Sequence, residues 1–177
     1  VSKHYLSLLQ KEKVIEKVSR GLYLKCDELN DRLFEIQFLS NKCIFSNLTA
    51  LYFHGYSNRI PLVYDVTVPR DYSGSLQHID NVDLYYVDKE VLNLGVTTII
   101  DEFGNELKCY DLERSICDII KNKNKLDSEL VNKALRQYFF SVNKNPIKLF
   151  NYAKKLKVYK KMMEVFEVLS WLKIKIV

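Results

Sequence analysis

The densest group of side chains that could do acid–base or metal chemistry lies between residues 111 and 118. Asp111, Glu113, Arg114 and Asp118 fall within about two turns of a predicted helix. Arg114 and Asp118 are spaced i, i+4, so they can form an ion pair on one helix face. Acidic side chains in a first helical turn also suit the helix dipole. A structural role is therefore the first interpretation, and a metal or acid–base site is the alternative.

A second candidate site is the E-x-K pattern of metal-dependent nucleases at Glu106-Leu107-Lys108. Asp88 or Asp101 upstream could supply a second carboxylate. Such a site would hold Mg²⁺ between the acids and use the lysine on the attacking water. Three-residue patterns are common by chance, so a Mg-dependent nuclease is kept only as an alternative function.

Nucleophile, zinc and phosphate patterns are missing from the sequence. His54 stands just before Gly55 at a predicted helix end, where a packing or hydrogen-bonding role suits it. The four cysteines form no C-x-x-C pair and have no nearby histidine; they are Cys26, Cys43, Cys109 and Cys117. We expect reduced, buried thiols, no zinc, no cofactor and no enzymatic activity.

Hydrophobic periodicity and turn residues predict an α+β protein whose elements would position these side chains. Ser2, Ser46, Asp111 and Asp127 are the expected N-caps, and Asp27-Glu28 is expected to open a helix with Leu29 on its apolar side. In chain order, the expected elements are a helix over 2–12, strands over 14–18 and 22–24, helices over 27–40 and 47–54, strands over 64–69, 82–87, 96–100 and 106–110, and helices over 111–121, 127–140, 145 onward and 159–172.

The distribution of charge is uneven along the 177 residues. The net charge is +5, with +3 in residues 1–20, +7 in residues 143–177 and −5 between them. Basic ends around an acidic centre favour an anionic partner, although solvated lysines would give the same pattern. No apolar run approaches the ~18 residues that a membrane span needs, so we expect a cytoplasmic protein without membrane contact.

The first 27 residues have the pattern of the end of a winged helix-turn-helix, in which a helix leads directly into a two-stranded hairpin. The helix would enter the major groove and the hairpin would lie against the DNA backbone. The candidate groove contacts are Lys3, His4 and Tyr5. The candidate phosphate contacts are Lys11, Lys13, Lys17, Ser19 and Arg20. An edge hairpin with solvated lysines is the alternative.

Several segments of the chain resemble the AbiEi-type antitoxins of bacterial abortive-infection toxin–antitoxin systems. The first is "LSLLQKEKVIEKVSRGLYL", which resembles the end of that family's winged helix. The others follow the family's order and spacing: "FSNLTALYFHGYSNRIP", "VTVPRDY", "LGVTTI", "CYDLERSICDII", "NKALRQYF" and "LFNYAKKLKV". A glycine that the family usually carries before the first wing strand is replaced around Glu12-Lys13.

The resemblance implies a two-part protein. Residues 1–27 would be the C-terminal part of the winged helix, which in the family has two further helices before it. Residues 28–177 would be the antitoxin domain, with a small mixed sheet to about residue 110 and a helical tail. The winged helix would bind inverted repeats upstream of its own operon and repress it. The second domain would neutralise a nucleotidyltransferase-type toxin without a stable complex. A stand-alone regulator with no toxin to oppose remains an alternative.

The C-terminal segment combines an apolar stripe with a lysine-rich outer face. Tyr152, Leu156, Tyr159, Met163 and Phe166 approximate helical spacing and predict a core stripe. The outer face would carry Lys154, Lys155, Lys157, Lys160 and Lys161. These lysines are either solvated or the surface through which the antitoxin acts.

Overall fold

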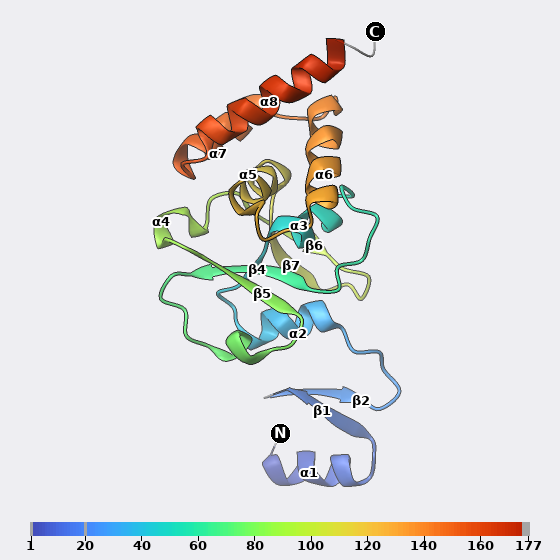
Figure 1. Ribbon diagram of the computed structural model, residues 1–177. Helices are drawn as coiled ribbons and strands as arrows, with labels where there is room; N and C mark the ends of the chain where they lie inside the picture. Colours follow the sequence, from blue (N-terminus) through green and yellow to red (C-terminus); the bar gives the residue numbers. More distant parts are fainter. Residues whose placement is uncertain (1, 20, 175–177) are drawn as a thin grey trace.

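A computed structural model describes residues 2–19 and 21–174 of the chain and gives a mixed α+β fold (Figure 1). Eight α-helices are present in this part of the chain, together with a two-stranded hairpin and a five-stranded mixed sheet. The N-terminal elements are α1 (Lys3–Lys11), β1 (Ile15–Ser19) and β2 (Leu22–Lys25). The sheet region contains α2 (Arg32–Leu39), β3 (Ile44–Phe45), α3 (Asn47–Phe53), β4 (Tyr64–Pro69), the 3-10 helix η1 (Ser75–His78), β5 (Val82–Val87), α4 (Lys89–Leu92), β6 (Val96–Ile100) and β7 (Glu106–Tyr110). The helical tail consists of α5 (Leu112–Asn122), α6 (Ser128–Phe140), α7 (Pro146–Lys155) and α8 (Tyr159–Ile174).

The sheet has the strand order β5-β4-β3-β7-β6. Strands β4 and β5 run parallel, whereas β6 and β7 form an antiparallel hairpin. The central strand β3 joins these two pairs, antiparallel to β4 and parallel to β7. Four strands follow from the sequence pattern, and β3 is the fifth. A strand of two residues shows no period-2 alternation, so only pairing in the folded sheet defines it.

Two apolar cores hold the sheet between layers of helices. One lies between the sheet and the pair α2 and η1, and includes Phe45, Val66 and Leu107, none of which is exposed. The other lies on the far side, where α3 and α5 pack on the sheet and α6, α7 and α8 cover α5 (Figure 1). Helix α5 is therefore enclosed on most of its surface, which explains why the acidic cluster of residues 111–118 is buried.

The start of α2 differs from the prediction. Asp27 and Glu28 do not cap it, and Leu29 is 80% exposed instead of lying on an apolar face. Asp31 is the N-cap, and its carboxylate accepts a hydrogen bond from the Phe34 amide at 3.0 Å. A carboxylate bonded to an exposed helical amide fixes the first turn, so the preceding residues are left as a connection.

The N-terminus of α3 is capped by a residue distant in sequence. Ser46 occupies the N-cap position as predicted, but its side chain makes no capping hydrogen bond. The carboxylate of Asp65, on β4, accepts from the Leu48 amide at 3.0 Å instead. The Asp65 amide in turn donates to the Thr49 hydroxyl at 2.8 Å. These bonds dock α3 on the edge of β4.

The C-terminal stripe also differs from the prediction in its register. Met162 is buried and Met163 only half-buried, while Tyr159 is 40% exposed. The chain turns sharply between α7 and α8, where Lys157 has φ 60°. A break of this kind resets the helical phase, so a single periodic stripe cannot run through both helices.

Cys43, Cys109 and Cys117 are buried free thiols, as predicted, whereas Cys26 is exposed in the connection after β2. Burial raises the pKa of the Cys43 and Cys109 thiols to about 12, so these thiols stay protonated and are poor nucleophiles. Among the described residues, no helix combines the length and apolar character that crossing a bilayer requires.

Asp65 makes the stability of the fold depend on pH. Burial raises the pKa of its carboxyl from 3.8 to about 6, against the opposing effects of the Tyr85 hydroxyl and the Leu48 amide. The folded state then binds this proton more tightly than the unfolded state does. Its contribution to the free energy of unfolding is greatest below about pH 4 and declines as the pH rises toward 6, by roughly 2–3 kcal/mol.

Asp65→Asn should remove this decline, because an amide still accepts the Leu48 bond but does not titrate. Urea unfolding of both proteins between pH 4 and pH 7 measures the difference, with the exposed Asp80→Asn as the control. Parallel pH profiles for the wild type and Asp65→Asn would contradict the assignment.

Candidate nucleic-acid interface

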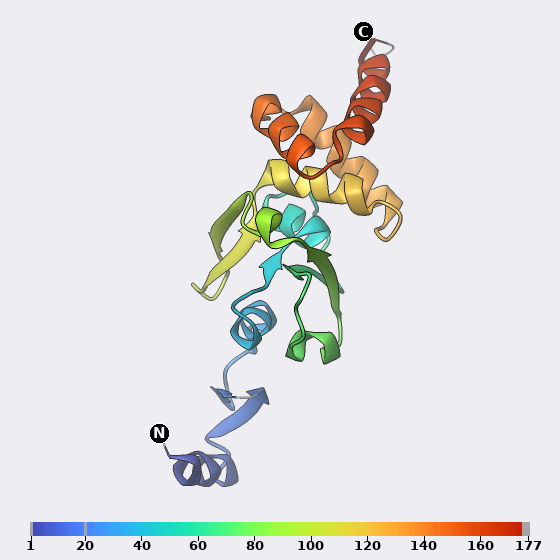
Figure 2. The ribbon, with the colours of Figure 1, turned by 90° about the vertical axis from the view of Figure 1, so that its left-hand side faces the viewer.

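Helix α1 and the hairpin form a small unit at one end of the molecule (Figures 1 and 2). Ser2 caps α1, with its hydroxyl accepting from the Tyr5 amide at 3.3 Å. Within α1 only Leu6 and Leu9 are half-buried, which confirms the predicted apolar face. Strands β1 and β2 pair antiparallel, and Gly21, with φ 84°, follows the turn. The predicted helix-and-hairpin arrangement is therefore present.

The connection between α1 and β1 adopts a conformation that glycine usually supplies. The Val14 amide donates to the Leu9 carbonyl at 3.0 Å, and the Lys13 amide donates to that of Gln10 at 3.1 Å. This bond pair is a Schellman motif, in which the penultimate residue lies in the left-handed region. Lys13 occupies that position with φ 56°. A side chain there costs about 1 kcal/mol relative to glycine.

The predicted DNA contacts are mostly exposed. Lys3, His4 and Tyr5 lie on the first turn of α1, and Lys11, Lys13 and Lys17 follow along its last turn, the connection and β1. Ser19 is half-buried and its Oγ is enclosed, with no hydrogen-bond partner among the described residues. Arg20 lies outside the described residues.

These exposed residues form a strip and not a pocket. Lys11 comes eight positions after Lys3, which is about 12 Å along a helix axis. Glu12 and Glu16 are also exposed and lower the local positive charge. An extended row of separated cations suits a chain of phosphates better than one small anion.

The unit is held to the rest of the protein by few side chains. None of residues 2–19 and 21–30 is buried. The hairpin faces α2 across a hollow of about 370 Å³, lined by Leu22, Leu24 and Phe34 among others. Tyr5 and Leu8 of α1 remain 54% and 44% exposed. The unit thus keeps an apolar surface that the described residues do not cover.

The acidic cluster of α5 is a largely buried structural network, in which only the Nη2 of Arg114 is enclosed without a hydrogen-bond partner among the described residues. The guanidinium of Arg114 is fully buried, and its Nε donates to both carboxylate oxygens of Asp118 at 3.0 and 3.1 Å. Its Nη1 donates to the carbonyls of Val91 and Leu94 at 2.7 and 2.8 Å. The guanidinium carbon lies 4.1 Å from the centre of the Tyr110 ring. The predicted i, i+4 ion pair is present.

The other two acids of this cluster, Asp111 and Glu113, join the start of α5 to α6 and α7. Lys148 of α7 lies 3.1 Å from the Asp111 carboxylate and 3.2 Å from that of Glu113. The Tyr138 hydroxyl donates to Glu113 at 3.3 Å, and the Tyr152 hydroxyl donates to Asp111 at 3.2 Å. Each carboxylate therefore has a protein partner, which is the structural role that their spacing favours.

The nuclease-like pattern does not assemble into a metal site. Glu106 and Lys108 are exposed on β7, and Asp88 forms a surface ion pair with Arg70 at 2.9 Å. Asp101 accepts bonds from the Phe103 and Asn105 amides within the β6–β7 turn. No group of three or more histidine, cysteine or acidic side chains in the described part of the chain could hold a metal ion.

His54 has the hydrogen-bonding role that the sequence suggests. Its Nε2 lies 2.7 Å from the Tyr110 carbonyl, so that nitrogen carries the proton and donates. The bond links the end of α3 to the end of β7.

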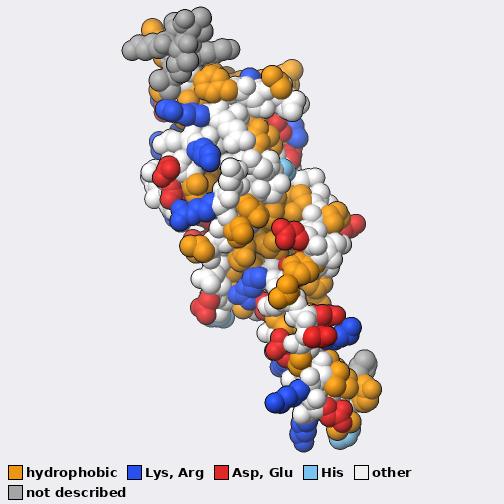
Figure 3. Space-filling view, turned by 90° about the vertical axis from the view of Figure 1, so that its right-hand side faces the viewer, with side chains coloured by type: hydrophobic (Ala, Val, Ile, Leu, Met, Phe, Trp, Pro, Cys, Tyr) orange, Lys and Arg blue, Asp and Glu red, His pale blue; other side chains and the backbone are white. Residues whose placement is uncertain are grey.

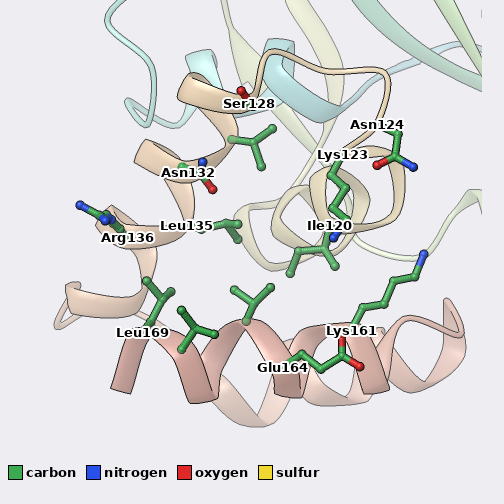
Figure 4. A pocket seen from close by; sticks show the side chains of 13 residues that line it. Ile120, Lys123, Asn124, Ser128, Asn132, Leu135, Arg136, Lys161, Glu164 and Leu169 are labelled. Carbon is green, nitrogen blue, oxygen red and sulfur yellow. The ribbon is translucent and has the colours of Figure 1, made fainter. Parts of the chain in front are cut away.

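One of the C-terminal lysines, Lys161, lies beside a groove (Figure 4). Lys154, Lys155, Lys157, Lys160 and Lys161 are all exposed, but they are divided between the end of α7, the turn and α8. The groove has a volume of about 570 Å³ between the end of α5, α6 and α8, with Leu135 and Leu169 among its apolar floor. Lys123, Arg136 and Lys161 lie along its rim. Lys123 and Arg136 were not predicted, because residues from three helices meet here only in the tertiary structure.

No protein-family model matches the chain, and no curated protein matches it either.

Arg114→Ala should lower the free energy of unfolding by about 3–5 kcal/mol, because it leaves the Asp118 carboxylate buried without a counterion and frees two carbonyls. Urea denaturation measures the loss. Arg136→Ala, on the exposed face of α6, is the matched control and should change stability by less than about 0.5 kcal/mol. The double variant Arg114→Met with Asp118→Leu should recover much of the loss, since no buried charge remains. An Arg114→Ala protein as stable as the wild type would refute this role.

Proposed function

We propose that this protein is a DNA-binding autorepressor and antitoxin of the AbiEi type, which counteracts a nucleotidyltransferase-type toxin. The observation that carries the proposal is the N-terminal unit: a helix leads through a tight Schellman turn into a two-stranded hairpin, with exposed basic side chains along both. That order of elements is the one expected at the end of a winged helix-turn-helix, which supports the proposal.

In this proposal α1 enters the major groove, and Lys3, His4 and Tyr5 reach base edges from its first turn. Lys11, Lys13 and Lys17 contact phosphates, and Ser19 and Arg20, the latter outside the described residues, are the remaining candidate phosphate contacts. Phosphate contacts set affinity and position, whereas base contacts set the sequence preference. The half-exposed Leu6 and Leu9 and the exposed Leu8 support this assignment, because a complete winged helix covers such a face with two further helices.

The backbone at Lys13 gives further support. AbiEi-type proteins usually carry a glycine before the first wing strand, and here Lys13 adopts the left-handed conformation that glycine favours. The loop therefore keeps the glycine-like geometry although the residue differs. A lysine at this position adds a cation beside the proposed phosphate contacts.

The antitoxin function is proposed for residues 28–177 and their lysine surface. Lys154, Lys155, Lys157, Lys160 and Lys161 are all solvent-exposed, and Lys161 lines the groove of α6 and α8. Such a surface can bind an RNA or an acidic protein. A stand-alone regulator would share the N-terminal unit but would not need this surface, so growth rescue discriminates the two functions.

Lys17→Gln should weaken binding to the DNA upstream of the gene and should lower the salt slope of log K by about 0.9, the value of one phosphate contact. Fluorescence anisotropy at several salt concentrations measures both quantities, against a scrambled duplex. Lys133→Gln makes the same charge change on α6, at the far end of the molecule, and should leave the slope unchanged. If the wild type binds the native and scrambled duplexes with equal affinity, the unit is a basic surface without sequence preference, and the proposed operator binding is wrong.

Co-expression with a nucleotidyltransferase-type toxin from the same operon should restore growth. Reversing Lys154, Lys155, Lys160 and Lys161 to Glu should abolish this rescue with the circular dichroism spectrum unchanged, because the contact charges are inverted. The matched control, Lys11→Glu with Lys17→Glu, should lose DNA binding and keep rescue. If the wild type fails to rescue growth, the stand-alone regulator is favoured. If the four-lysine variant still rescues, this surface is not involved.

A further inference from the structure

Strand β6 forms an open edge of the five-stranded sheet. It lies at the end of the strand order and pairs with β7 alone (Figure 2). Among the described residues, no strand pairs with its outer side. Its side chains alternate, with Val96, Thr98 and Ile100 exposed and Thr97 and Ile99 half-buried. An edge of this kind offers unpaired backbone groups to another strand.

The ladder with β7 fixes which backbone groups of β6 point outward. The Asp111 amide donates to the Gly95 carbonyl at 2.7 Å, and the Asp101 amide donates to that of Asn105 at 3.0 Å. Hydrogen-bonded pairs alternate along an antiparallel ladder, so the odd-numbered residues of β6 bond to β7. The backbone groups of Val96, Thr98 and Ile100 therefore face away from β7. The Val96 amide donates to the Asn93 carbonyl at 3.5 Å, so the free outward groups are the Val96 C=O and the N–H and C=O of Thr98 and Ile100.

The composition of β6 lacks the features that usually block an edge. All five residues, Val-Thr-Thr-Ile-Ile, are β-branched and uncharged, with no proline and no bulge. The opposite edge, β5, carries the exposed Asp83 within the strand. A charge within an edge strand opposes pairing with a second copy. Of the two edge strands of the five-stranded sheet in the described part of the chain, β6 is the one that combines open backbone groups with an uncharged strand.

The two ends of β6 carry opposite charges. At its N-terminal end, Val96 lines a hollow of about 660 Å³ together with Lys42, Lys89 and Lys108. Lys89 pairs with Asp71 there at 2.7 Å, which leaves a positive balance. At its C-terminal end follow Asp101 and Glu102, with Glu106 opposite Ile100 on β7. An antiparallel pair of β6 strands would set each acidic end against a basic end, whereas a parallel pair would set like charges together.

We propose that β6 is the self-association edge of this protein, pairing antiparallel with β6 of a second copy about a two-fold axis at Thr98. Thr98 then faces Thr98 of the other copy in a hydrogen-bonded pair, and Val96 faces Ile100. This register gives a partner to the outward N–H and C=O of Thr98 and Ile100 and to the Val96 C=O, while the Val96 N–H keeps or exchanges its long bond to Asn93. The two copies of Lys108 stand three strand spacings apart, about 14 Å, which exceeds the Debye length at physiological salt.

Exposed apolar side chains beside β6 would add to this contact. Ile100 and Phe103 are 62% and 54% exposed, and Ile60 is 66% exposed on the opposite wall of a hollow of about 400 Å³. Figure 3 shows hydrophobic side chains gathered over the middle of one face of the molecule. Isolated apolar residues are normal on a surface, but a cluster next to an unpaired edge favours a protein partner.

The inference goes beyond the proposed function and does not depend on it. A two-fold pair would also present two copies of the N-terminal unit, which is the symmetry of an inverted repeat. Self-association and DNA binding are measured in separate experiments, so either proposal can be refuted while the other stands.

Thr98→Lys should convert the full-length protein from dimer to monomer at concentrations where the wild type is dimeric, as measured by sedimentation velocity. Thr98→Pro should do the same, because it removes an outward N–H that an edge strand does not need for folding. Thr98→Val keeps the neutral β-branched edge and should stay dimeric. Thermal unfolding checks that all three variants fold. A wild type that remains monomeric, or a Thr98→Lys dimer, would overturn the proposal.

A cysteine cross-link tests the register. In a Cys26→Ser background, Thr98→Cys should form a disulfide-linked dimer under mild oxidation, because Cα atoms of a hydrogen-bonded pair lie about 5.5 Å apart, within the range of a disulfide. Tyr86→Cys, exposed on the opposite edge, is the control and should not cross-link. Equal cross-linking of both would contradict the assigned edge. Sequence-independent DNA binding by a dimeric wild type would refute the proposed function and leave the inference intact.

Discussion

The buried guanidinium of Arg114 is the interaction on which the C-terminal part of the structure depends. It pairs with Asp118 on its own helix and donates to the carbonyls of Val91 and Leu94 at the end of α4. It also lies over the ring of Tyr110 at the end of β7. One side chain thus joins α4, β7 and α5. A charge in such a site is tolerated only while its partners hold their geometry, because an unpaired buried ion costs several kcal/mol.

The same network also contacts Gly95, the residue before the edge strand β6. Gly95, which precedes β6, has φ 78°, and a Cβ added there would lie 2.8 Å from that of Arg114. Only glycine fits this close approach without displacing the backbone. The Gly95 carbonyl then accepts the Asp111 amide and begins the β6–β7 ladder. The position of α5 therefore determines which backbone groups of β6 remain free for a partner.

The N-terminal unit, in contrast, is not held together by a buried network. Its helix and hairpin bury no residue completely among those described, and they rest on α2 through half-buried side chains. An isolated hairpin is marginally stable in water, so its contacts with α1 and α2 are needed to keep it folded. Figures 1 and 2 place the unit at one end of the molecule, with α2 between it and the sheet.

Local signals in the sequence determined most of the elements. Ser2, Asp111, Asp127 and Asn145-Pro146 mark helix starts, Gly21 marks the hairpin turn, and the i, i+4 spacing of Arg114 and Asp118 gives their ion pair. Each of these depends on residues a few positions apart, so a linear pattern is enough to reveal them. The likeness to AbiEi-type antitoxins likewise comes from the sequence alone, and it remains a proposal.

Only the tertiary structure decided the features that join distant segments. The two-residue β3, the capping of α3 by Asp65 and the groove of α6 and α8 all require residues that are far apart in the chain. The exposure of β6 is of the same kind, since its apolar sequence would suit a central strand equally well. Strand order, and not composition, leaves it at an edge, because the energy of pairing depends on which neighbours the fold supplies.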